Sequence, residues 1–254
     1  MPVPLDTVLL LVSHCYRRPF SLLTSHLLFV IPYFMTSGIL FDFNGVIVDD
    51  ESQHCDALTA TLAEYGYDLN RDSYYQEYLG YDDRECFRFT FERLGLPQDE
   101  EALQRAVARK HSLYEQAIRN SMRLVPGAAE FVENAALEGF QLAIVSGALR
   151  SEIELILDSI GLRPHFAEIV SAEDVNACKP SPRGYIRARE MLDLPPRRCV
   201  VIEDSLPGLE AARAAGLRCA MLTTSHPETA CSDADLVWRD FVGHEAAELP
   251  WAHV

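Results

Sequence analysis

The sequence predicts an α/β fold, a doubly wound parallel sheet with a small all-helical cap domain inserted after the first strand. From residue 124 onward, short apolar runs alternate with helical patterns, and this alternation implies a parallel sheet covered by helices on both faces. Residues 52–123 instead hold helical patterns without strand-like alternation. We therefore expect an α/β core at residues 35–51 and 124–254, with the cap domain at residues 52–123.

The first strand is the apolar run that ends at Asp42. Gly45 follows three residues later, so the strand stops at a tight, acidic turn. A carboxylate in this position lies at the carboxyl end of a strand, where open α/β sheets bind their ligands. Asp42 is therefore the first candidate functional residue.

The cap region has three helical patterns. One covers residues 52–64, and another begins after a capping carboxylate at Asp82 or Asp83 and stops at Gly95. The longest covers residues 98–119 and has acidic residues in its first turn, where the helix dipole favours them.

The core has four more predicted strands, each preceded by a helix. The strands are expected at residues 140–145, 168–170, 199–202 and 218–222, and the helices at residues 127–138, 151–160, 181–192 and 207–215.

Polar residues gather where the predicted strands end. They are Asp42, Asn44, Ser146, Gly147, Glu203 and Asp204. Carboxylates at one edge repel each other unless they are neutralised, and Mg²⁺ prefers carboxylates together with water and phosphate oxygens. Lys179, in the loop after the 168–170 strand, would hold a negative oxygen, and Ser146 with nearby amides would bind others. The expected site suits phosphoryl transfer from a small phosphorylated metabolite.

Four motifs carry a family resemblance: D-F-N-G-V at 42–46, V-S-G at 145–147, K-P-S-P at 179–182 and V-I-E-D-S at 201–205. In this order and spacing the chain resembles the haloacid dehalogenase-like hydrolases, in the branch of β-phosphoglucomutase and sugar-phosphate phosphatases. The resemblance covers residues 35–222. It implies a Rossmann-like core and a cap that closes over the site and selects the substrate.

The resemblance also implies residue roles. Asp42 is the nucleophile that becomes an aspartyl-phosphate, and Ser146, Gly147 and Lys179 bind the phosphoryl group. The Mg²⁺ ligands are Asp42, Glu203, Asp204 and the main-chain carbonyl of Asn44. His54, at the family position of a cap-side histidine, and Arg84, near a substrate-binding arginine of relatives, are candidate substrate contacts. The alternatives are an exposed helical histidine and a solvated ion-pairing arginine.

Asn44 departs from the family pattern, which has an aspartate two residues after the nucleophile. That aspartate protonates the leaving group and then activates water, and an amide does neither. Three explanations follow: a slow phosphatase that favours good leaving groups, a different displacement reaction, or a phosphate-binding or regulatory protein with little turnover. The preferred interpretation is a Mg²⁺-dependent phosphomonoester hydrolase, with a β-phosphoglucomutase-like phosphotransferase as the alternative with the same mechanism.

Composition limits the partners. The formal net charge is −16, which disfavours nucleic acid and anionic membranes. The seven cysteines are scattered and include no C-x-x-C pair, a pattern typical of a reducing compartment. We expect a cytoplasmic protein that is a monomer or a weak dimer.

Residues 1–34 differ from the rest. Arg17 and Arg18 precede an apolar run that is too short and interrupted to span a membrane, and no signal-cleavage site follows. A twin-arginine signal is the alternative. We expect an N-terminal extension that is not physiological, with translation starting at Met35.

Overall fold

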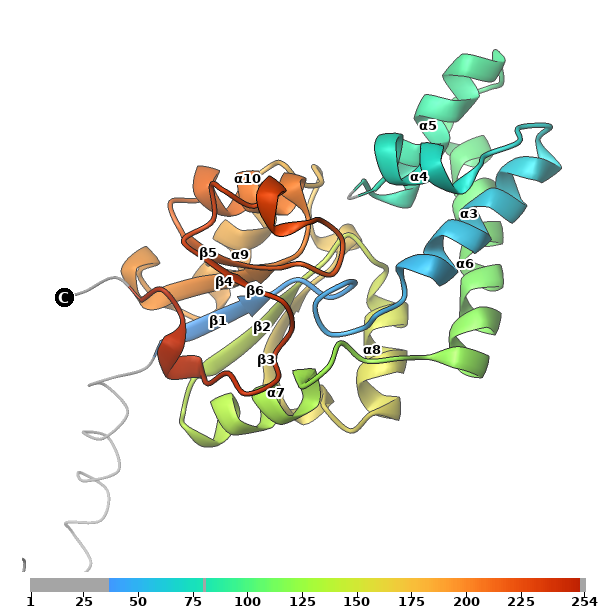
Figure 1. The fold of residues 1–254 in the computed structure, drawn as a ribbon. Helices are drawn as coiled ribbons and strands as arrows, with labels where there is room; N and C mark the ends of the chain where they lie inside the picture. Colours follow the sequence, from blue (N-terminus) through green and yellow to red (C-terminus); the bar gives the residue numbers. More distant parts are fainter. Residues whose placement is uncertain (1–36, 80, 252–254) are drawn as a thin grey trace, which may run out of the picture. The chain divides into compact units, whose positions relative to one another are not determined.

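The computed structural model describes residues 37–79 and 81–251, so the expectations for residues 1–34 and Met35 lie outside the described residues. Within these ranges, six strands form one parallel sheet in the order β3-β2-β1-β4-β5-β6 (Figure 1). The strands are β1 (Gly38–Phe41), β2 (Gln141–Val145), β3 (Phe166–Val170), β4 (Cys199–Glu203), β5 (Arg218–Leu222) and β6 (Leu236–Trp238). The predicted doubly wound fold is confirmed.

The core helices cover both faces of this sheet. They are α7 (Ala128–Leu137), α8 (Arg150–Ser159), α9 (Arg183–Met191) and α10 (Leu206–Ala214). Successive residues of a strand point to opposite faces. Ile39 and Phe41 accordingly share an apolar cluster with α7 and α8, whereas Leu40 belongs to the cluster that includes α9 and α10. Because both faces are buried, the strands are continuous apolar runs rather than alternating ones.

The register of the central strands aligns their carboxyl ends. Phe41 of β1 lies opposite Ile144 of β2 and Ile202 of β4. The residues that follow these positions therefore emerge at the same edge of the sheet. This is the tertiary basis of the functional site.

Among the described residues, four helices lie between β1 and α7 and form the helical insert. They are α3 (Glu51–Glu64), α4 (Arg71–Glu77), α5 (Asp83–Leu94) and α6 (Glu100–Ser121). Apolar side chains of all four, with Leu58, Tyr78 and Phe91 among the most buried, form a third cluster separate from the two on the sheet. The Asp82 side chain caps α5, and Gly95 ends it in the left-handed conformation, as the sequence predicts.

Two neighbouring chain segments connect these helices to the core. The amide of Asp49 donates to the carbonyl of Arg123 at 2.9 Å, and the amide of Val125 donates to the carbonyl of Ile47 at 3.1 Å. The entry and exit of the helical insert are thus tied together (Figure 1). The first turn of α3 begins directly beside the carboxyl end of β1.

The structure adds two elements that the sequence did not predict, α4 and β6. Each is short, and β6 has three residues at the edge of the sheet. Short 3₁₀ helices complete the described part at Arg163–His165, Ala172–Asp174, Pro196–Arg198, Glu228–Ala230 and Ala246–Glu248. No helix among the described residues has the length and apolar character needed to cross a bilayer.

Candidate active site

Asp42 lies directly after β1, with its amide donating to the carbonyl of Ile202 at 2.9 Å. The backbone thus continues the pairing of β1 with β4 for one residue and fixes the position of the carboxylate. Asp42 is 8% exposed. Burial raises the pKa of Asp42 to about 7, and the neighbouring charge of Glu203 adds to this effect.

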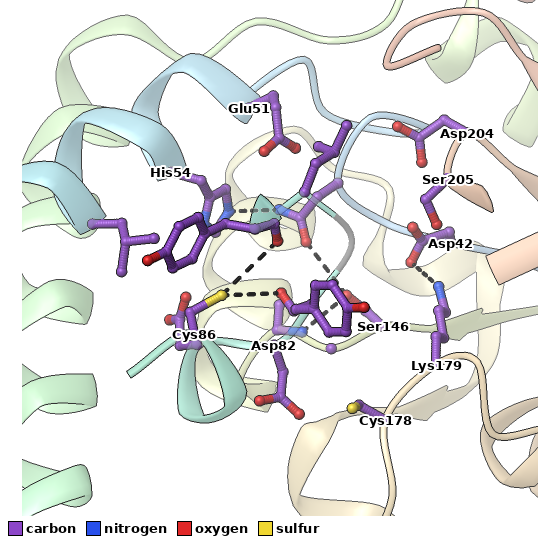
Figure 2. Close-up of a pocket in the computed structure, with 18 of the residues that line it drawn as sticks. Asp42, Glu51, His54, Asp82, Cys86, Ser146, Cys178, Lys179, Asp204 and Ser205 are labelled. Carbon is purple, nitrogen blue, oxygen red and sulfur yellow. Dashed lines mark hydrogen bonds and ion pairs between the residues drawn. The ribbon is translucent and has the colours of Figure 1, made fainter. Parts of the chain in front are cut away.

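Lys179 joins two of the strand-end carboxylates. Its Nζ lies 2.6 Å from Oδ1 of Asp42 (Figure 2) and 2.5 Å from Oε1 of Glu203. Burial lowers the pKa of Lys179, but the charges of Asp42 and Glu203 outweigh burial and raise the pKa above its usual value. The side chain is therefore a permanent cation beside the candidate nucleophile.

Glu203 is completely buried and fully hydrogen-bonded. Besides Lys179, its Oε1 accepts from the Tyr185 hydroxyl at 2.6 Å. Its Oε2 accepts from the amides of Asp204 and Ser205 and from the Ser205 hydroxyl, at 3.0–3.1 Å. A Cβ on Gly208 would lie 1.8 Å from Oε1, so only glycine fits there. This arrangement holds Lys179 in place.

Asp204 faces Asp42 from the end of β4. Carboxylate oxygens of Asp42, Glu203 and Asp204 lie within 4.8 Å of one another. Burial raises the pKa of Asp204 well above its usual value, and the charges of Asp42 and Glu203 raise it further. Gly45, at φ 75°, permits the close approach, because a Cβ there would lie 1.9 Å from Oδ2 of Asp204.

Clustered carboxylates of this kind fit a hard divalent cation such as Mg²⁺. Among the described residues, Asp42 and Asp204 each have one side-chain partner, Lys179 and Ser225 respectively. In Glu203, by contrast, both carboxylate oxygens are already engaged by protein groups. The donor set therefore favours Asp42 and Asp204 as ligands and Glu203 as the anchor of Lys179.

Asn44 lies between the core and the start of α3. Its Nδ2 donates to Oδ2 of Asp50 at 2.8 Å and lies 2.9 Å from Nε2 of His54. Its Oδ1 accepts from the hydroxyl of Ser146 at 3.4 Å. The predicted residues Asn44, His54 and Ser146 are thus brought together. Asp50, which sequence reasoning did not single out, is completely buried among them.

His54 links this group to α6. Its ring stacks on Tyr114 with centroids 4.1 Å apart, and its Nδ1 lies 2.5 Å from Nζ of Lys110. Lys110 is 1% exposed and pairs with Asp83 at 2.9 Å. Burial and Lys110 lower the pKa of His54, but Asp50 more than offsets them and raises it. The histidine therefore lies in a buried, hydrogen-bonded environment and is not an exposed helical residue.

Sequence reasoning missed Lys110 and Tyr114, although a pattern was available. Both follow Leu103 and Ala106 on the buried face of α6, at the three- and four-residue spacing of one helix face. A lysine in an apolar stripe indicates a buried charge with a partner.

The strand ends and the helical insert, at α3, α4 and α5, line one cavity of about 110 Å³ (Figure 2). The predicted residues on its wall are Asp42, Asn44, His54, Ser146, Gly147, Lys179 and Asp204. Arg84 lies elsewhere: its guanidinium pairs with Glu100, with Nη1 2.7 Å from Oε1, on the wall of an adjoining cavity of about 1020 Å³. Glu203 is buried beneath the cavity.

Comparisons with known proteins agree with this geometry. CbbY of Rhodobacter capsulatus is 31% identical over 194 residues, which cover 74% of this chain and 85% of CbbY. Hexitol phosphatase B of Escherichia coli is 29% identical over 181 residues, covering 70% of this chain and 80% of that protein.

A solved structure of CbbY from Rhodobacter sphaeroides, in complex with phosphate, matches with a TM-score of 0.72 at 29% identity. The match covers 82% of this chain and 96% of that one. An aspartate-to-asparagine mutant of the same protein was solved in complex with xylulose-(1,5)-bisphosphate.

The family model described as haloacid dehalogenase-like hydrolase matches residues 39–222, which include all four motifs and the helical insert. The expected family and sugar-phosphate phosphatase branch are confirmed, and with them the expectation of a hydrolase. The chain belongs to the haloacid dehalogenase-like hydrolases.

Proposed function

We propose that the protein is a Mg²⁺-dependent phosphomonoester hydrolase that acts on a small phosphorylated metabolite of the sugar-phosphate class. One observation carries the proposal: the Lys179 ammonium bridges Asp42 and the fully hydrogen-bonded Glu203, at the strand ends where Asp204 faces Asp42. This is the arrangement that a carboxylate nucleophile and its phosphate site require. The names of the similar proteins, among them a hexitol phosphatase, support the substrate class.

In the proposed reaction, an Asp42 oxygen forms a bond to phosphorus while the bond from phosphorus to the leaving-group oxygen breaks. Lys179 stabilises the negative charge on the phosphoryl oxygens, and the Ser146 hydroxyl donates to another of them. The carboxylates of Asp42 and Asp204 and the Asn44 carbonyl would hold Mg²⁺, which would neutralise phosphate charge. Water then hydrolyses the aspartyl-phosphate, releasing inorganic phosphate and restoring Asp42.

Asn44 makes this hydrolase slow with alkyl phosphates. The departing alkoxide needs a proton, and the Asn44 amide donates hydrogen bonds but is too weak an acid to transfer one. His54, whose Nε2 lies 2.9 Å from the Asn44 amide and 3.3 Å from Asp50, is the residue that partly replaces the missing acid in this proposal. We propose that turnover is fastest with leaving groups that depart without protonation, such as aryl oxides.

Hydrolysis of p-nitrophenyl phosphate tests the proposal. Wild-type protein is expected to release p-nitrophenol with Mg²⁺ and to lose this activity with a chelator, and Asp42→Asn is expected to abolish it. Asp158→Asn, an exposed change on α8, is the matched control and retains activity. Equal activity of Asp42→Asn and wild type would refute the mechanism.

A phosphate-binding or regulatory protein is the second candidate, and Asn44 is the observation that favours it. It predicts that wild type binds inorganic phosphate in calorimetry yet turns over no phosphomonoester, aryl or alkyl. A β-phosphoglucomutase-like reaction predicts that turnover of β-glucose 1-phosphate depends on added sugar bisphosphate.

We also propose a cytoplasmic location and a monomeric or weakly dimeric state. The cysteines among residues 37–79 and 81–251 are free, which fits a reducing compartment. Fractionation of cells and analytical ultracentrifugation test these two proposals.

A further inference from the structure

Lys179 is the cation of the phosphate site that lies beside the candidate nucleophile Asp42. Of the described residues that line the 110 Å³ cavity, Lys179 is the only lysine or arginine. It is already paired with Asp42 and Glu203 at the position where the transferred phosphoryl group is proposed to bind. The cavity thus provides for one phosphate and offers no second lysine or arginine to another.

The part of the cavity wall that comes from the helical insert is acidic. Glu51 and Asp82 line the cavity from this side (Figure 2), as does Asp83. Lys110 neutralises Asp83, but within the described residues neither Glu51 nor Asp82 forms an ion pair with a lysine or arginine. Glu51 accepts from the Tyr74 hydroxyl, and Asp82 caps α5. Both carboxylates therefore lie on the cavity wall without a lysine or arginine partner among the described residues.

The adjoining 1020 Å³ cavity is lined by two arginines among the described residues, but each forms an ion pair with a glutamate. Arg84 makes two hydrogen bonds to Glu100, and Arg88 pairs with Glu85. The same wall carries Asp82. A distal phosphate would have to compete with these glutamates for Arg84 and Arg88. The cavity beyond the phosphate site is thus not built for a second anion.

We infer that the substrate carries its only anionic group at the reacting phosphate, on a leaving alcohol that is a neutral polyol or, better, an amine-bearing one. This inference rests on the proposed phosphatase activity and specifies its substrate class. A second phosphate near Glu51 and Asp82 is repelled, whereas an ammonium group is attracted. The chain would then differ from the CbbY mutant solved with a sugar bisphosphate.

Three matched sugar phosphates test the inference: glucose 6-phosphate, glucosamine 6-phosphate and glucose 1,6-bisphosphate. Each is measured as a competitive inhibitor of p-nitrophenyl phosphate hydrolysis, so the result does not require that the compound itself is turned over. We expect glucosamine 6-phosphate to bind most tightly and the bisphosphate about tenfold more weakly than glucose 6-phosphate. The difference should shrink as the salt concentration rises.

Two variants identify the residues responsible. Asp82→Asn keeps an oxygen to cap α5, and Glu51→Gln keeps an acceptor for Tyr74, so each removes charge with little change of shape. Each variant should reduce both the preference for glucosamine 6-phosphate and the discrimination against the bisphosphate. Glu92→Gln removes an exposed acid from the same helix as Asp82 and should leave the order unchanged.

The outcomes are separable. Absence of p-nitrophenyl phosphate hydrolysis contradicts the proposed function. Retained hydrolysis with the bisphosphate binding as tightly as the monophosphate, or with none of the three sugars inhibiting, overturns the specificity inference alone.

Discussion

Replacing Asn44 with aspartate should convert a slow hydrolase into a faster one. The Nδ2 of Asn44 donates to Asp50 at 2.8 Å. In Asn44→Asp, an oxygen takes the place of this donor, so two buried carboxyl groups meet at hydrogen-bond distance. They cannot both be ionised there without strong repulsion, and one of them retains a proton.

The size of this effect follows from the geometry. Two like charges about 4 Å apart repel by about 4 kcal/mol at an effective dielectric constant of about 20. Since one pKa unit corresponds to about 1.4 kcal/mol, the repulsion raises one carboxyl pKa by up to about 3 units, from about 4 toward neutrality. A carboxyl group that is protonated near neutral pH is suited to act as a general acid.

The assay compares kcat/KM of wild type and Asn44→Asp on p-nitrophenyl phosphate and on sugar phosphates across pH. General acid–base help is worth about 10²–10⁴-fold, so the sugar phosphates should gain by about this factor. The aryl ester should gain little, because its leaving group departs without a proton. Adding Asp50→Asn to this variant removes the repulsion and should lower the pKa of the acid seen in the pH profile.

Equal kcat/KM for wild type and Asn44→Asp on every substrate would refute the reasoning about the missing acid. A gain of equal size on aryl and sugar phosphates would also contradict it, since protonation of the leaving group would then not limit the rate.

Three further predictions concern the supports of the site. Glu203→Gln weakens the hold on Lys179, and kcat on p-nitrophenyl phosphate should fall about 10–100-fold, whereas unchanged kcat would contradict its anchoring role. Gly208→Ala inserts a Cβ 1.8 Å from a Glu203 oxygen and should cost about 1–3 kcal/mol in chemical denaturation. The hydrogen bond that the His111 ring donates to the Glu152 carboxylate raises the pKa of His111, so this pair stabilises the fold below about pH 6.5 and less as the pH rises through the raised pKa. His111→Gln should therefore destabilise more at about pH 6 than at about pH 9 in urea titrations, and an equal loss at both would count against this assignment.

Much of the fold follows from local features of the sequence. The apolar run before Asp42 forms a strand because both of its faces are buried, and Asp82 and Gly95 bound α5 through hydrogen bonding and backbone freedom close to them in the chain. The grouping of the strand-end residues could also be predicted, because parallel strands place their carboxyl ends at one edge of the sheet. The short elements α4 and β6 escaped prediction because too few residues carry their pattern.

The sequence by itself determined the family, the parallel sheet and the grouping of Asp42, Ser146 and Lys179. Only the tertiary structure decided the partners of Asn44, the anchoring of Lys179 by Glu203 and the pairing of Arg84 with Glu100. No periodic pattern in the sequence indicates which of these segments come into contact. These contacts depend on how α3 and α6 pack over the strand ends, and in that buried space each charge must find a counter-charge or a hydrogen bond.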